Sequence, residues 1–243
     1  MTPGGAQAVL FDLDGTLVDT PAGMAEVLTT VVRETGREPD ESALRATIGR
    51  PLATSLAILL DTASTGDPDV TRAAERARTL FTEQVIPRAP ELVFPGVPAL
   101  LAELRDRGVT LAVVTSKVHS SAVELLDAAG LLGAFDTLSC HGMTPRGKPS
   151  PDLALLAAAE LKVPAGRCLV VGDAVDDIRM AHRAGMAAYG VGYGVAGHDR
   201  LLNAGARAVA GTTTELRDAL AMAVAAGRLA AEPHPTGPRR KQG

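Results

Sequence analysis

The sequence predicts an α/β protein with a parallel sheet and a large helical insertion after its first strand. Apolar runs at residues 8–11, 109–114 and 168–171 are short and nearly continuous, as expected of parallel strands that are buried on both faces. The first and last of these runs are followed closely by acidic residues, and open α/β sheets bind their ligands at such strand ends. The segment 19–94 between the first two runs has helical periodicity and is far too long to be a connecting loop.

Composition places the chain among globular proteins and argues against several partners. Of its 243 residues 46% are hydrophobic, enough for a substantial core, and its net charge of −4 offers no attraction for nucleic acid or an anionic membrane surface. No apolar run approaches the ~18 residues needed to cross a membrane, and no secretion signal is evident. The two cysteines, Cys140 and Cys168, have neither metal-site nor disulfide-framework spacing. We expect a cytoplasmic protein that binds neither nucleic acid nor membrane.

The insertion divides into expected helices, each with one apolar stripe. Thr20-Pro21 is typical of an N-cap followed by proline in the first turn, and apolar residues recur at helical spacing after it. Three more helices are expected over residues 44–48, 52–60 and 70–81. Because every stripe needs a partner, the helices should form a small bundle.

Helices and strands alternate after the insertion, as in a parallel sheet built from β-α-β units. Apolar periodicity and turn residues predict, in order, a helix at 97–107, the strand 109–114, a helix at 118–129, a short strand at 135–139, a helix capped by Ser150 with Pro151 as its first residue, the strand 168–171, and a final strand and helix at 206–210 and 215–225.

Asp12 and Asp14 follow the first strand one residue apart and meet Gly15, where the backbone can turn sharply. Alternate residues of an extended segment share a side, so both carboxylates can face one crevice while Leu13 packs away from it. Two acids this close repel each other unless a cation lies between them or one holds a proton. A carboxylate can act as a covalent nucleophile toward phosphorus and Mg²⁺ prefers oxygen ligands, but an acidic turn after a strand is also common without any function.

The residues around this pair carry a more specific resemblance. Asp-Leu-Asp-Gly-Thr-Leu-Val-Asp at 12–19, directly after an apolar strand, resembles the first motif of the haloacid dehalogenase superfamily, in its phosphatase branch. The resemblance implies a Rossmann-like parallel sheet core with an inserted α-helical cap domain. It also implies that Asp12 is the nucleophile that attacks phosphorus and that Asp14 is the general acid and base.

Two further motifs follow in the family's order. Thr115 ends the second apolar run, where the family has a threonine or serine that donates its hydroxyl to a phosphoryl oxygen. Ser116 stands where many relatives have asparagine, and Lys117 can meet either substrate or solvent; we take both as candidate substrate-binding residues. Lys-Pro-Ser-Pro-Asp at 148–152 resembles the third motif and implies that Lys148 pairs with the nucleophile and neutralises phosphate charge.

The fourth motif, Gly-Asp followed four residues later by Asp, is matched directly after the third apolar run. It implies Mg²⁺ as the cofactor. The expected metal ligands are Asp12, Asp14 through its backbone carbonyl, Asp173, and Asp177 as an alternate ligand or one that acts through water. Asp176 is expected to cap the helix that follows.

The resemblance also implies domain boundaries and a cap residue of interest. The expected units are a core of residues 1–18 and 95–226, a cap of residues 19–94 hinged near 18–21 and 94–96, and a disordered tail of residues 227–243. Within the cap, Gly49-Arg50-Pro51-Leu52 is similar to a loop of phosphoglycolate phosphatase-like proteins. Arg50 can grip a carboxylate or a second phosphate in bidentate fashion, or it can be a solvated arginine at a helix end.

The run Gly-Tyr-Gly-Val-Ala-Gly at 192–197 spells the dinucleotide-binding pattern G-x-G-x-x-G, which we interpret as coincidental. That pattern needs the first strand and a full helix of a β-α-β unit. Here it comes late in the chain and only a short helical stretch, at 198–203, follows.

These motifs together predict a Mg²⁺-dependent phosphatase, similar to phosphoglycolate phosphatases, that hydrolyses a small phosphorylated metabolite through an aspartyl phosphate. One alternative is a sugar phosphomutase of the β-phosphoglucomutase type, although Thr16 stands where mutases often have valine. Others are a phosphatase of a biosynthetic intermediate and a non-catalytic phosphate-binding module. The sequence leaves the substrate open and is compatible with a monomer or a homodimer.

Overall fold

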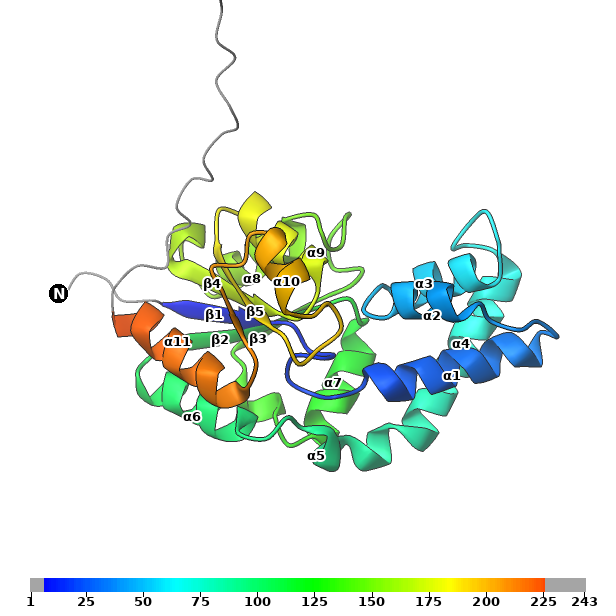
Figure 1. Ribbon diagram of the computed structural model, residues 1–243, viewed down its shortest axis with the longest axis horizontal. Helices are drawn as coiled ribbons and strands as arrows, with labels where there is room; N and C mark the ends of the chain where they lie inside the picture. The colour runs from blue at the N-terminus through cyan, green and yellow to red at the C-terminus, as the bar shows by residue number, and fades with distance from the viewer. Residues whose placement is uncertain (1–6, 226–243) are drawn as a thin grey trace, which may run out of the picture.

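A six-stranded, all-parallel sheet forms the centre of the computed structural model, which describes residues 7–225 (Figure 1). The strands are β1 Ala8–Phe11, β2 Thr110–Thr115, β3 Thr137–Cys140, β4 Cys168–Gly172, β5 Ala187–Val191 and β6 Ala208–Ala210. Their order in the sheet is β3-β2-β1-β4-β5-β6. The chain therefore builds outward on one side of β1 and then on the other, which leaves a crevice at the carboxyl ends of β1 and β4, where such sheets bind ligands.

Helices cover both faces of this sheet, and the alternation of β1 shows why its sequence is continuously apolar. Val9 and Phe11 belong to one buried cluster with α6 and α7, whereas Ala8 and Leu10 belong to a second cluster with α8 and α9. The helices of this part are α6 Val97–Asp106, α7 His119–Ala128, α8 Asp152–Glu160, α9 Val175–Arg183, α10 His198–Asn203 and α11 Thr213–Ala225. Figure 1 shows α6 and α11 on one side of the sheet and α8, α9 and α10 on the other.

The inserted helices lie together beyond the carboxyl end of the sheet (Figure 1). They are α1 Pro21–Glu34, α2 Glu41–Thr47, α3 Leu52–Leu59 and α4 Pro68–Gln84, followed by the short α5 Ala89–Leu92, and 3₁₀ turns occur at Ile86–Arg88, Leu132–Ala134 and Ala165–Arg167. The apolar stripe of α1, which includes Leu28 and Val32, is buried and packs with that of α4. Burial of these stripes holds the bundle together, as the sequence pattern predicted.

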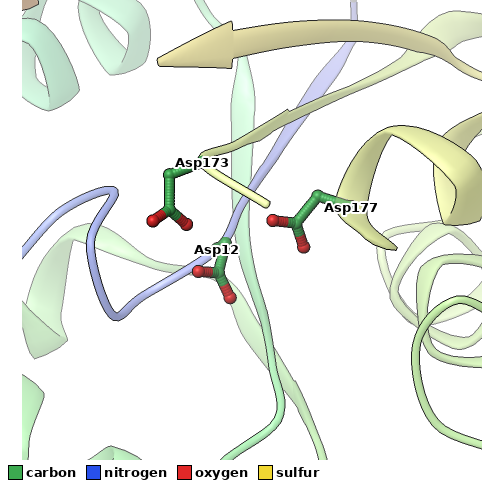
Figure 2. A group of neighbouring side chains, drawn as sticks. All are labelled: Asp12, Asp173 and Asp177. Atoms are coloured by element: carbon green, nitrogen blue, oxygen red, sulfur yellow. The ribbon is translucent and has the colours of Figure 1, made fainter. Parts of the chain in front are cut away.

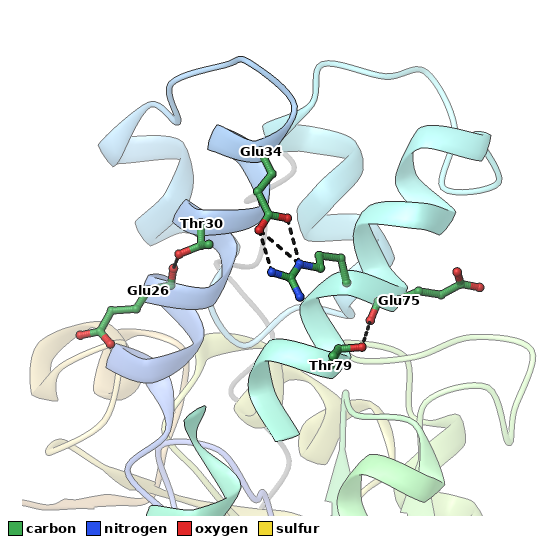
Figure 3. A network of polar contacts seen from close by, with 6 residues as sticks. Glu26, Thr30, Glu34, Glu75 and Thr79 are labelled. Carbon is green, nitrogen blue, oxygen red and sulfur yellow. Dashed lines mark hydrogen bonds and ion pairs between the residues drawn. The ribbon is translucent and has the colours of Figure 1, made fainter. Parts of the chain in front are cut away.

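Polar contacts on the outside of the bundle add little to this packing. Arg76 of α4 makes a two-pronged contact with Glu34 of α1, and both side chains are largely exposed (Figure 3). The Thr30 and Thr79 hydroxyls donate instead to the carbonyls of Glu26 and Glu75, one turn back on their own helices (Figure 3). Exposed pairs of this kind contribute at most ~1 kcal/mol, so apolar burial dominates.

The insertion joins the sheet through two chain segments that run side by side. The Asp19 amide donates to the Leu92 carbonyl, the Phe94 amide donates to the Leu17 carbonyl, and Val18 faces Val93 in an antiparallel bridge. The two segments that connect the insertion to the sheet therefore lie next to each other, as a hinge requires. That residues 19–94 move as a separate cap stays a prediction, and the expected tail at 227–243 lies outside the described residues.

The expected elements are all present, with small shifts at their ends. The strand predicted at 135–139 spans 137–140, and α8 begins at Asp152 rather than at Pro151. Ser150 was expected to cap α8, but its hydroxyl donates to the Asp152 carboxylate, 2.7 Å away, instead of accepting a backbone amide. No helix within residues 7–225 has the length and apolarity to span a membrane.

Candidate active site

Four loops bring the predicted site residues to the carboxyl edge of the sheet. Asp12 follows β1, Thr115 ends β2 and Asp173 follows β4, and these three strands are neighbours in the sheet. The Asp12 amide donates to the carbonyl of Val171 in β4 at 2.8 Å, so the ladder extends to the first acid. Lys148 comes from the loop between β3 and α8.

Asp12, Asp173 and Asp177 form a buried cluster of carboxylates (Figure 2). Each offers an oxygen that lies within 4.8 Å of the other two, and Asp173 and Asp177 are both only 1% exposed. The Lys148 ammonium pairs with Asp12 and lies 2.7 Å from an oxygen of Asp177. Three buried acids thus share one lysine, a net negative charge that a bound cation would balance.

Burial and mutual repulsion shift the protonation of this cluster. Burial raises the pKa of Asp12 well above its usual value; Lys148 opposes this, and Asp177 and Asp173 add to it. The pKa of Asp173 is raised to about 7, again by burial and by the charge of Asp177. Burial lowers the pKa of Lys148, but Asp12 and Asp177 outweigh it, so the lysine stays charged. Three oxygen ligands that repel one another at this spacing fit a hard divalent cation such as Mg²⁺.

The carboxylate of Asp14 lies outside this cluster and has its own partners. Thr20, which was expected to cap α1, makes no side-chain cap; its hydroxyl donates to Asp14. The Lys117 ammonium lies 3.2 Å from the same Asp14 oxygen and 4.1 Å from the ring centre of Phe81 in α4. A role of the Asp14 carbonyl as a metal ligand stays a prediction.

Two smaller expectations about side chains meet different outcomes. Thr115 is buried, and its hydroxyl oxygen accepts the Lys117 amide at 3.1 Å, which leaves its proton available for a phosphoryl oxygen. Asp176 was expected to cap α9, but this prediction is wrong because Asp177 accepts the amide of Ala174 at 3.1 Å. Asp177 thus serves both the beginning of α9 and the carboxylate cluster.

Two cavities meet at Asp12, and every predicted site residue lines at least one of them. The first, of about 240 Å³, lies between the inserted helices and the sheet and contains Asp14, Thr115 and Lys117. The second, an open groove of about 840 Å³, contains Lys148 and the acidic cluster. Asp12, Arg50 and Ser116 line both.

The loop at 192–197, whose glycine pattern the sequence analysis treated as coincidental, contacts the carboxylate cluster through Asp173. The Val195 amide donates to the Asp173 carboxylate at 2.8 Å, and the Tyr193 hydroxyl donates to the Thr16 carbonyl at 3.1 Å. A Cβ on Gly194 would lie 2.3 Å from an Asp173 side-chain atom, so only glycine fits there. Gly194, the second glycine of the dinucleotide-like pattern, therefore allows close backbone approach to a carboxylate instead of a phosphate.

Comparison with known proteins places this site in a family. A model described as haloacid dehalogenase-like hydrolase matches residues 6–185, most of the chain. The chain belongs to the haloacid dehalogenase-like hydrolases. This hydrolase is 44% identical over 209 residues to a probable phosphatase IndB of Dickeya dadantii, an alignment that covers 86% of this chain and 90% of the relative.

Further likenesses agree with this family. The hydrolase is 32% identical over 233 residues to a phosphoglycolate phosphatase of Rhodospirillum rubrum, which covers 93% of this chain and 96% of the relative. A crystal structure of β-phosphoglucomutase from Clostridium difficile superposes with a TM-score of 0.80 and 22% identity, covering 90% of this chain and 97% of the other. The second likeness shows the shared fold alone.

Proposed function

We propose that the protein is a Mg²⁺-dependent phosphatase that hydrolyses a small phosphomonoester through a covalent phosphate on Asp12. The observation that carries this is the position of Asp12, between a lysine-and-carboxylate cluster on one side and Asp14 on the other. The relatives named as phosphatases support the same reaction.

Asp12 acts as the nucleophile. Its carboxylate oxygen bonds to phosphorus while the bond from phosphorus to the ester oxygen breaks, and Asp14 gives its proton to the leaving alcohol. Asp14 then takes a proton from a water molecule that attacks phosphorus, which breaks the bond to Asp12 and releases phosphate. The ion pair with Lys148 favours the ionised form of Asp12, which is the form that can attack phosphorus.

Groups on the sheet side of Asp12, across from Asp14, stabilise the negative charge of the phosphoryl group. Lys148 holds the nucleophile through its ion pair and faces the transferring oxygens, and the Thr115 hydroxyl donates to one of them. Asp12, Asp173 and Asp177 are the residues that would hold Mg²⁺, which supplies electrostatic stabilisation of the phosphoryl oxygens when bound.

The substrate expected from the phosphoglycolate phosphatase relatives is a small phosphate ester with a carboxylate. Arg50 lines both cavities and is exposed, so it is the cap residue that could meet such a carboxylate; whether the substrate carries one is decided by the comparison of esters described below. A phosphomutase would instead return the phosphate to a sugar, and Thr16, whose hydroxyl is 3.3 Å from Asp173, remains the residue that argues against it.

The proposal is tested by phosphate release from p-nitrophenyl phosphate, 2-phosphoglycolate, benzyl phosphate and hexose phosphates, with Mg²⁺ and with EDTA. We expect Mg²⁺-dependent release that Asp12→Asn lowers by at least ~10³-fold, because the nucleophile is lost. Asp19→Asn is the matched control, since Asp19 lies in the same motif and its side chain is exposed. Full activity of Asp12→Asn, or no release from any ester, would refute the phosphatase.

A further inference from the structure

The 240 Å³ cavity is the place where the leaving alcohol of a substrate must lie. Asp14, the residue that would protonate this alcohol, lines that cavity and does not line the larger groove. Asp12 lines both, so a phosphoryl group on it stands at their junction. The walls of the smaller cavity therefore describe the organic part of the substrate.

Those walls are mostly apolar on the cap side. The apolar side chains that line them from α1, α3, α4 and the loop before α3 include Met24, Leu28, Ile48, Leu52, Ala77 and Phe81. The volume lies just below the range of about 300–1,000 Å³ typical of pockets for small organic ligands. A two-carbon carboxylate would leave most of this apolar surface in contact with water, whereas a ring-sized group would cover it.

The charges at the cavity also disfavour a carboxylate on the substrate. Lys117 is committed to Asp14 and lies over the Phe81 ring, so it is not free to bind a second anion. Glu124 of α7 adds a negative charge to the wall and accepts the hydroxyl of Thr82 in α4 at 2.9 Å.

Thr82 donates to Oε1 of Glu124, and no hydrogen bond from another described residue reaches Oε2, so Oε2 can accept a hydrogen bond from a ligand. Arg50 and Arg78, the two arginines of the wall, are exposed, so water already solvates their charges.

We propose that the substrate is the phosphomonoester of an uncharged, largely apolar alcohol of about ring size that presents a hydrogen-bond donor to Glu124. This rests on the proposed phosphatase function and narrows its substrate class. It makes the cap cavity a selector of apolar volume, with Leu52 and Phe81 as its specificity-determining contacts and Glu124 as the group that rejects carboxylates.

The test compares benzyl phosphate with 2-phosphoglycolate, both esters of primary alcohols, in the full-length protein with Mg²⁺. We expect kcat/KM for benzyl phosphate to exceed that for 2-phosphoglycolate by at least ~10-fold, since a few buried methylene equivalents in an apolar pocket are worth that much. A ratio at or below one overturns the proposal. Absence of hydrolysis for both esters and for p-nitrophenyl phosphate contradicts the phosphatase function itself, which separates the two failures.

Two substitutions then assign the selectivity to the wall. Leu52→Asn places an amide in the cavity and should lower the ratio by about 10-fold, whereas Ile58→Asn, a residue of the same helix that is 44% exposed, should leave it within twofold. Glu124→Gln removes the negative charge and should lower the ratio several-fold by raising activity on 2-phosphoglycolate. Its control is Asp127→Asn, an exposed acid on the same helix.

A ratio that Leu52→Asn leaves unchanged overturns the role of the apolar wall, and a ratio that Glu124→Gln leaves unchanged overturns the role of the charge. Circular dichroism and thermal denaturation of each variant establish that it is folded. Because the wild-type ratio is measured first, the proposal stays open to refutation even where a variant fails to fold.

Discussion

The two sides of Asp12 are built on opposite physical principles. On the sheet side, three buried carboxylates and one lysine are held within a few ångströms of one another by backbone that leads directly out of the strands. On the cap side, a cavity is lined by apolar side chains from helices that contact the sheet domain across a hydrophobic surface. Electrostatic catalysis needs exact placement of few groups, whereas selection of a substrate by its shape needs volume and tolerates variation.

The buried carboxylates of the sheet side reduce the stability of the fold, whereas the apolar walls of the cap side do not. Burial raises the pKa of Asp12 and of Asp173, so ionisation of these two carboxylates opposes folding until a cation binds. The apolar cavity walls carry no such penalty, because Leu28 and Phe81 are part of the continuous core. Substitutions on the two sides should therefore affect stability in different ways.

The largest effect is expected from Lys148→Met, which removes the ammonium group that pairs with Asp12 and Asp177. We expect a loss of activity of ~10³-fold from lost phosphoryl charge stabilisation. We also expect a decrease in stability of the metal-free protein of ~3–5 kcal/mol, because the acids are left uncompensated. Phosphate release and thermal denaturation in EDTA measure both. Lys162→Met, in the exposed turn after α8, is the control, and equal behaviour of the two variants would show that Lys148 is no part of the site.

Asp173→Asn should separate function from stability, with a loss of activity of ~10²-fold through weaker Mg²⁺ binding. The pKa of Asp173 is raised to about 7 in the folded protein, so between its unfolded value of 3.8 and about 7 the folded state binds more protons. Stability contributed by this group is therefore present below pH 4 and is lost as the pH rises toward 7.

The variant removes that pH dependence. In EDTA we expect the melting temperature of the wild type to decrease between pH 5 and pH 8, and that of Asp173→Asn to decrease less. At pH 8 the variant should therefore melt at a higher temperature than the wild type. Adding Mg²⁺ should raise the melting temperature of the wild type at pH 8 and that of the variant much less. If the melting temperatures of the two proteins in EDTA depended identically on pH, ionisation of Asp173 would not reduce the stability of the folded protein.

The sequence predicted the sheet side better than the cap side, for a physical reason. Buried parallel strands show as continuous apolar runs, and an acid directly after such a run is placed by the strand itself, so Asp12 and Asp173 could be located without a structure. Lys148 needed the family resemblance, because a lysine in a loop carries no periodicity. The catalytic roles of these residues stay predictions, while their convergence at one edge of the sheet is observed.

No comparable sequence pattern predicted the cap cavity. Its wall is assembled from helices whose apolar stripes predict burial but not which residues of a stripe face another helix and which face a cavity, as Leu28 and Leu52 illustrate. The side-chain caps predicted at Thr20 and Ser150 were wrong, because each hydroxyl donates to a nearby carboxylate, that of Asp14 or Asp152, instead of accepting a backbone amide. Gly194 was set aside with the coincidental dinucleotide-like pattern, because the sequence does not show which group the backbone of a glycine approaches.

A smaller effect is expected from Gly194→Ala, which tests whether the sheet side depends on placement. The added methyl would lie 2.3 Å from an Asp173 side-chain atom and must displace that carboxylate. We expect a loss of activity of about 10- to 100-fold, as misplacements of ~1 Å produce. The apparent Mg²⁺ affinity should fall in parallel. Gly133→Ala, with no atom within 4 Å of its new methyl, is the control, and an unaffected Gly194→Ala would mean that the loop moves freely.

The smallest effect is expected from Thr82→Val, which removes the hydrogen bond from the cap to Glu124 on the sheet side. One such bond between partly exposed groups contributes ~0.5–1.5 kcal/mol, which corresponds to about 2- to 10-fold in an equilibrium. If the bond holds α4 against α7 when substrate is bound, the loss should appear in KM for benzyl phosphate, with kcat nearly constant. Thr79→Val, whose hydroxyl donates only to its own helix, should change neither constant. A fall in kcat without a change in KM would instead show that closure of this wall governs the placement of Asp14, and the two sides of Asp12 would then be coupled through the cap.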